Sequence, residues 1–76
     1  MTPKLPEVSG REAVRAFQSV GYVLARIDGS HMRLRHPTDS PRLPLSVPDH
    51  KELKPGLLRR LIRDAGLTVD EFVRLL

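Results

Sequence analysis

The sequence contains no cysteine among its 76 residues. This absence excludes disulfide bonds, thiolate zinc sites and cysteine nucleophiles together, and it fits a reducing compartment. The first residues also lack the apolar segment of a signal peptide, and no stretch is long enough to span a bilayer. We therefore expect a cytoplasmic protein that makes no contact with a membrane.

Internal repeats and low-complexity tracts are absent as well. The composition, 39% hydrophobic and 29% charged, is that of an ordinary folded domain. A chain of this size buries only about 60% of the surface that its unfolded form exposes, so it can build one thin core. We expect a loose N-terminal tail over residues 1–8 and a single domain over residues 9–76.

Cationic residues outnumber acidic ones, with 13 lysines and arginines against nine aspartates and glutamates, and the formal net charge is +4. Most of the cations are arginines, whose planar guanidinium suits phosphate. This balance favours a polyanionic partner such as RNA. The alternative is a basic surface without such a partner.

Two capping boxes predict where helices begin. Ser9 precedes Glu12 by three residues, and Thr68 precedes Glu71 in the same way. Apolar residues at helical spacing follow each box. They predict a helix over about residues 10–20 and a short last helix near the C-terminus.

A further helix is predicted between these two. Pro55 suits a first helical turn, and Gly66 suits the position just after a helix end. The apolar stripe between these two residues predicts a helix over about residues 55–65.

Three stretches with alternating apolar and polar residues, 23–28, 31–36 and 43–47, predict β-strands. Asp28-Gly29-Ser30 is typical of a tight hairpin turn, and residues 37–41 read as a loop. Pro44 favours an edge position for the third strand, because proline cannot donate a ladder hydrogen bond. The expected fold is therefore α+β, in the order α-β-β-β-α with a short C-terminal helix, and its three-stranded antiparallel sheet carries the helices on one face.

The hairpin divides its side chains between two faces. The turn is either Asp28-Gly29 or Gly29-Ser30, and both choices give the same division, because side chains alternate with a period of two. The apolar set is expected under the helices and comprises Val23, Ala25, Ile27, Met32 and Leu34. The polar set is expected in solvent and comprises Arg26, Asp28, His31, Arg33 and Arg35. We call this second set the polar strip.

The polar strip suits the cleavage of RNA. Arginines bind and neutralise phosphate. A histidine titrates near neutral pH, so His31 could take a proton from a 2′-hydroxyl or give one to a leaving oxygen. RNA supplies its own nucleophile, so this chemistry requires no serine, cysteine or metal. The alternative is that His31 is an ordinary surface residue.

The remaining histidines are weaker candidates. His36 falls on the core side of its strand, which favours a structural role, and His31 and His36 point to opposite faces, so they do not share a metal. His50 lies in the loop before the second helix, where a structural role is again favoured. Lys54 lies near the start of that helix, whose free amides attract phosphate.

Two stretches carry a family resemblance. The first is Leu24-Ala25-Arg26-Ile27-Asp28-Gly29-Ser30-His31, followed by Arg35-His36-Pro37. The second runs from Val47-Pro48-Asp49-His50-Lys51-Glu52-Leu53-Lys54-Pro55-Gly56 to Gly66-Leu67. Together they resemble the HicA-type toxins, also called YcfA-like proteins, over about residues 9–73.

This resemblance implies a double-stranded-RNA-binding-like fold and a cofactor-free, metal-independent ribonuclease that cuts mRNA. It also implies a HicB-type antitoxin that covers the active face. By position, the catalytic histidine of the family is His31, and Gly29 and Ser30 shape its turn. Many members have a second histidine where this chain has Met32; because Met32 points into the core by alternation, we expect the chemistry to be retained.

The main hypothesis is therefore a toxin ribonuclease in which His31 is the general acid or base and Asp28 orients its imidazole. The residues expected to bind phosphate are Arg26, Arg33, Arg35 and Lys54. A non-catalytic RNA-binding module of the same fold is one alternative. A domain whose basic face binds an acidic protein is another.

Overall fold

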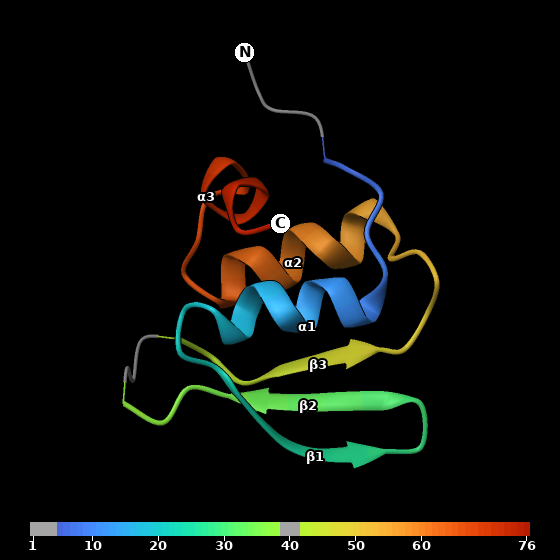
Figure 1. Cartoon of the computed structure of the whole chain (residues 1–76), viewed down its shortest axis with the longest axis vertical. Helices are drawn as coiled ribbons and strands as arrows, with labels where there is room; N and C mark the ends of the chain where they lie inside the picture. Colours follow the sequence, from blue (N-terminus) through green and yellow to red (C-terminus); the bar gives the residue numbers. More distant parts are fainter. Residues whose placement is uncertain (1–4, 39–41) are drawn as a thin grey trace.

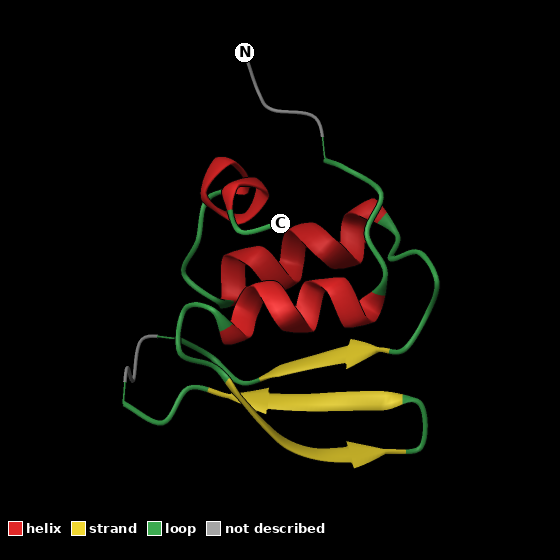
Figure 2. Cartoon of the chain, in the orientation of Figure 1, coloured by secondary structure: helices red, strands yellow, loops and turns green. Residues whose placement is uncertain are grey.

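The computed structural model describes residues 5–38 and 42–76 of the chain. Its elements follow one another in the order α1 (Gly10–Gln18), β1 (Val23–Asp28), β2 (His31–Arg35), β3 (Leu45–Pro48), α2 (Pro55–Asp64) and α3 (Val69–Arg74) (Figure 1). Helices form one layer and the antiparallel sheet the other, which confirms the expected α+β fold (Figure 2). Of the loop expected over residues 37–41, residues 39–41 lie outside the described part of the chain.

The helices begin where the sequence predicts. In both capping boxes the hydroxyl accepts from the amide of the glutamate, and that carboxylate accepts from the amide of the capping residue: Ser9 with Glu12, and Thr68 with Glu71. Helix α2 instead has Lys54 at its N-cap without a side-chain hydrogen bond. None of the helices in the described ranges is long and apolar enough to cross a membrane.

The sheet has the strand order β1-β2-β3, so β1 and β3 are its two edges, as Pro44 predicted for the third strand. Asp28 pairs with His31 and Ile27 with Met32, which makes Gly29-Ser30 the two-residue turn. Gly29 has a φ of 58°, a left-handed conformation that glycine adopts without steric cost. This turn places His31 at the very start of β2.

The side-chain alternation of β1 is interrupted by a bulge at Ala25, between Leu24 and Arg26. A bulge adds one unpaired residue and shifts the alternation by one position. Leu24 therefore lies opposite Leu34, and Val23 lies opposite Arg35 on the outer face. The prediction that Val23 and Ala25 share the face of Met32 is wrong for this reason.

The helices cover β2 and β3 but leave β1 uncovered. Met32 and Leu34 of β2 are buried, whereas every residue of β1 is exposed, and Ile27 reaches 62%. In Figure 1, β1 is the strand farthest from α1 and α2. The expected burial of the apolar β1 residues under the helices is therefore also wrong, because two short helices cover only two of the three strands.

One core joins all the elements except β1. Phe17 of α1 and Phe72 of α3 are fully buried, with ring centroids 5.3 Å apart, and the Tyr22 hydroxyl donates to the Leu43 carbonyl over 2.7 Å. Val8 is 3% exposed, and its carbonyl accepts from the Leu53 amide over 2.8 Å. Packing therefore begins before Ser9, within the segment 1–8 that the sequence suggested as a tail.

Candidate functional site

His31 lies between two edge strands at the hairpin end of the sheet. Its backbone pairs with Asp28 of β1 on one side and with Pro48 of β3 on the other, and its side chain is exposed. The Ser30 carbonyl next to it accepts from the Asp49 amide over 2.7 Å, which ties the turn to the end of β3. The Gly29-Ser30 turn is thus anchored to the end of β3 directly before His31, the first residue of β2.

The Asp28 carboxylate is shared by two arginines of the polar strip. Its Oδ2 atom accepts from Arg33 Nε over 3.1 Å and lies 3.1 Å from Arg26 Nη2. All three side chains are about half exposed or more. The structure therefore brings Arg26, Asp28 and Arg33 together, and the orientation of the His31 imidazole by Asp28 stays a prediction.

The other two predicted phosphate-binding residues take no part in this ion-pair cluster. Arg35 is exposed at the far end of β2, opposite Val23, and lines one surface hollow with Arg26 and Arg33, but it makes no ion pair within the described residues. Lys54 is exposed at the N-cap of α2, and neither residue lines the pocket that contains His31. The strip and the start of α2 are thus separate cationic positions.

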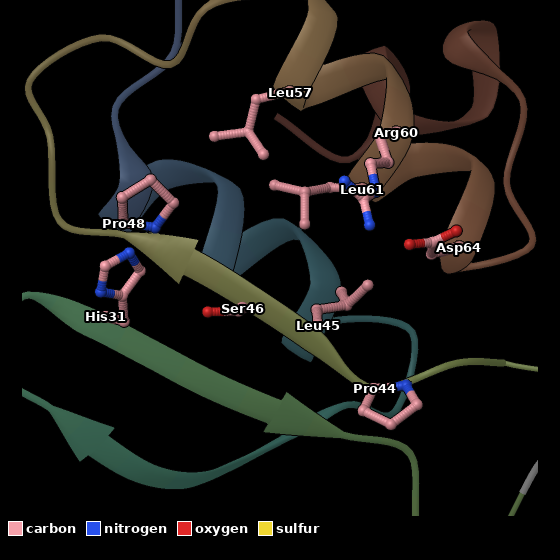
Figure 3. Close-up of a pocket in the computed structure, with 9 residues that line it drawn as sticks. All are labelled: His31, Pro44, Leu45, Ser46, Pro48, Leu57, Arg60, Leu61 and Asp64. Carbon is pink, nitrogen blue, oxygen red and sulfur yellow. The ribbon is translucent and has the colours of Figure 1, made fainter.

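A pocket of about 330 Å³ lies beside His31, between β3 and α2 (Figure 3). Its polar lining consists of His31, the Ser46 hydroxyl of β3, and Arg60 and Asp64 of α2. Figure 3 shows the side chains of Arg60 and Asp64 projecting from the helix toward the strand. The pocket therefore brings His31, the predicted catalytic residue, together with Ser46, Arg60 and Asp64, to which the sequence analysis assigned no role.

Helical spacing explains why α2 contributes these side chains. Leu57, Arg60, Leu61 and Asp64 stand at positions i, i+3, i+4 and i+7, which form one stripe along a helix. Leu58 of the neighbouring stripe and Leu61 of this one are both buried in the core, so Arg60 and Asp64 lie at the margin of the core. This spacing was visible in the sequence, but the position of the stripe against His31 depends on how α2 packs on β3.

The charged groups of this pocket are not paired with each other. Arg60 and Asp64 are four residues apart, yet within the described residues neither makes an ion pair. Asp64 is half-buried and Arg60 is exposed. Both side chains are therefore available to a ligand.

The other two histidines have different surroundings. His36 Nε2 lies 2.9 Å from the Val20 carbonyl, and its ring packs edge to face on Tyr22 with centroids 5.2 Å apart. These contacts support the structural role predicted for His36. His50 is exposed, and its backbone carbonyl accepts from the Gly10 amide over 2.9 Å. Among the residues in 5–38 and 42–76, no group of three potential metal ligands comes together.

Two carboxyl groups have clearly shifted pKa values, and both belong to capping boxes. Hydrogen bonds from the Ser9 amide and hydroxyl lower the pKa of Glu12, and hydrogen bonds from Thr68 lower the pKa of Glu71. Neither glutamate lines the pocket beside His31. These shifts therefore concern helix stability rather than the site.

Comparison with protein families gives one match. Residues 10–67 match the family model described as HicA toxin of bacterial toxin-antitoxin. The matched segment begins at the first residue of α1 and ends just after α2, so it includes His31 and every residue of the adjacent pocket. No curated protein matches the chain.

Proposed function

Because the chain belongs to the HicA toxin family, we propose that it is a toxin that cleaves messenger RNA, with His31 as its general acid or base. The observation that carries this proposal is the placement of His31. His31 is exposed, lies two residues before Arg33 on the same face of β2, and also lines the pocket between β3 and α2. A phosphate bound by the arginines of the polar strip would therefore lie within reach of a group that transfers protons.

The proposed reaction uses the 2′-hydroxyl of RNA as its nucleophile. The 2′-oxygen bonds to phosphorus and loses its proton, and the bond from phosphorus to the 5′-oxygen breaks. The products are a 2′,3′-cyclic phosphate and a 5′-hydroxyl, whose oxygen receives a proton. His31 either accepts the first proton or donates the second, and water serves as the other partner. This route requires no metal, so cleavage should persist in EDTA.

We assign phosphate binding to the exposed cations around this position. Arg26 and Arg33 share one carboxylate, so together with Asp28 they retain a net positive charge. Arg35 extends the strip, and Lys54 stands at a helix start whose amides are free to meet an anion. These contacts position RNA by its backbone and carry no sequence information of their own.

The partner in this proposal is a HicB-type antitoxin that covers the face containing His31. Family membership supports an antitoxin partner in general. The outer face of the sheet displays Arg26, Arg33 and Arg35, so an acidic antitoxin surface would complement it and slow the approach of RNA. Co-expression with the adjacent reading frame, followed by purification and RNA cleavage assays, tests whether this partner exists and blocks the reaction.

The first test compares growth and RNA integrity after induction of the wild-type chain, His31→Ala and His50→Ala. Both histidines are exposed, but only His31 lines the pocket. Loss of a general acid or base costs about 10²- to 10⁴-fold in rate, so His31→Ala should stop both growth arrest and mRNA fragmentation. His50→Ala should behave as the wild type. Equal toxicity of the wild type and His31→Ala would refute the assignment.

A non-catalytic RNA-binding module is the second candidate, and two observations favour it. Asp28, which pairs with His31 in the sheet, is engaged by two arginines. In the described part of the chain, no second histidine lines the pocket. If purified wild-type protein binds RNA in a salt-dependent manner but leaves it intact, with and without EDTA, that second function replaces the first.

A further inference from the structure

The pocket beside His31 has two chemically different ends. His31 and Pro48 lie opposite each other in the sheet at one end, and Asp64 lies near Leu45 at the other (Figure 3). The α2 residues that line it run from Leu57 to Asp64, a length of about 10 Å at the helical rise. One end thus carries the proposed catalytic imidazole and the other a carboxylate.

Asp64 limits what can occupy its end of the pocket. Its carboxylate is half-buried, and no described residue forms an ion pair or hydrogen bond with that group. An ionised carboxylate accepts hydrogen bonds and repels phosphate. The part of a nucleotide that contacts Asp64 is therefore a base edge with N–H donors, and the phosphate lies toward His31 and Arg60.

The size and the apolar lining agree with a single unstacked nucleotide. A volume of about 330 Å³ stands at the small end of ligand pockets. Half-buried Leu57 and exposed Pro44 offer apolar surface for the face of a base, and Leu61, which is only 4% exposed, forms the floor. Arg60 lies one turn before Asp64 on the same stripe. Sequence-specific recognition of RNA generally uses such unstacked bases, read on their hydrogen-bonding edges.

We propose, on the basis of the ribonuclease function above, that this pocket binds the nucleotide whose 2′-hydroxyl attacks, and that Asp64 selects guanine there. Guanine presents two adjacent donors, N1–H and the N2 amino group, which match the two oxygens of a carboxylate. Adenine and cytosine place an acceptor nitrogen beside their amino group, and uracil flanks its one N–H with two carbonyls. Arg60 binds the phosphate that follows this nucleotide.

The first test maps the cut sites of purified wild-type protein and of matched variants on a mixed RNA pool. Wild-type cuts should be enriched for guanine on the 5′ side of the broken bond by about 10-fold or more. Asp64→Asn keeps the shape of the side chain but replaces one acceptor oxygen with an NH2 donor. This variant should lose the enrichment for guanine and still cut RNA. Glu52→Gln makes the same charge change at an exposed residue outside the pocket and should retain it. Unchanged preference in Asp64→Asn would overturn the proposal.

Arg60 has a matched control in its neighbour Arg59, which is exposed on α2 but does not line the pocket. Arg60→Ala should lower kcat/KM by about 10- to 100-fold through loss of a charge-assisted contact, and Arg59→Ala should change it little. Far-ultraviolet circular dichroism verifies that both variants are folded. Equal rates for the two variants would overturn the role of Arg60.

The second test measures binding without cleavage and separates this proposal from the proposed function. Guanosine 3′-monophosphate and uridine 3′-monophosphate are titrated separately into His31→Ala protein and followed by amide NMR. Guanosine should shift the Ser46 and Leu61 amides more strongly than uridine, and Asp64→Asn should remove the difference. Specific guanosine binding by His31→Ala, together with a wild-type protein that cuts no RNA, would support the pocket and refute the ribonuclease. Cleavage of RNA by the wild type, without stronger binding of guanosine than of uridine, would support the ribonuclease and refute guanine selection by the pocket.

Discussion

Asp28 and Arg33 are diagonal neighbours across the first hairpin, with Arg33 Nε donating to Asp28 Oδ2 over 3.1 Å. Arg26 lies at the same distance from the same oxygen. One carboxylate therefore neutralises part of the charge of two arginines on the proposed RNA-binding face. This sharing has a measurable consequence for RNA binding.

Asp28→Asn should tighten RNA binding and steepen its dependence on salt, because both arginines become available to phosphate. The slope of log K against log salt concentration should grow by between about one and two. Fluorescence anisotropy in a His31→Ala background measures this without cleavage. Because the ion pairs are half exposed or more, stability should change by only about 0.5 kcal/mol.

Asp70→Asn is the matched control for Asp28. It breaks the exposed Arg74–Asp70 pair of 2.8 Å on α3 and changes the net charge by the same amount, away from the strip. Equal effects of the two variants on the salt slope would contradict the local explanation. A cleavage rate that falls at least 10-fold in Asp28→Asn with binding intact would instead support orientation of His31 by Asp28.

Gly21→Ala should destabilise the fold. Gly21 has a φ of 101°, and an added Cβ atom would lie 2.5 Å from His36 Nε2, the atom that contacts the Val20 carbonyl. Backbone strain of this kind costs about 1–3 kcal/mol, and displacement of the imidazole adds to it. The midpoint of urea unfolding should fall accordingly. Gly56→Ala is the control, since its Cβ meets open space at the start of α2 and should leave stability unchanged or raise it by up to about 1 kcal/mol.

The order of the elements was predictable because its signals are local. The Ser9–Glu12 and Thr68–Glu71 boxes define two helix starts within four residues each, and Gly29 lies in the turn between strands of clear alternation. The bulge at Ala25 has no such signal, because alanine has no particular preference for a bulge. An uninterrupted alternation therefore predicted the wrong face for Val23.

The candidate site was predictable only in part for a similar reason. His31 could be placed on the solvent side of β2 from alternation alone, and the polar strip followed from the same rule. The pocket depends on the packing of α2 against β3, which no local pattern encodes. Arg60 and Asp64 therefore stood on a recognisable helical stripe without any indication that His31 lay opposite.

The two capping boxes should make stability depend on pH in the acid range. Their hydrogen bonds lower the pKa values of Glu12 and Glu71 below the ordinary 4.5, so the folded state holds fewer protons than the unfolded state. This stabilisation is complete above the unfolded pKa and is lost as the pH falls through the lower, folded pKa. Urea unfolding of the wild type and of a Glu12→Gln, Glu71→Gln double variant should therefore differ at pH 7 and converge at lower pH. A constant difference from pH 7 to pH 2.5 would contradict this origin.

Because the helices leave the first strand uncovered, truncation of two residues that pair across the hairpin should lower stability by different amounts. Ile27 and Met32 are opposite each other, yet Ile27 is 62% exposed and Met32 is 7% exposed. Truncation of a buried side chain removes its transfer free energy and leaves a cavity, so Met32→Ala should cost about 2–5 kcal/mol. Ile27→Ala removes mostly solvated surface and should cost about 0.5 kcal/mol. Urea unfolding of both variants decides the point: similar losses of stability would mean that Ile27 is covered by a helix in solution, as the alternation had predicted for this residue.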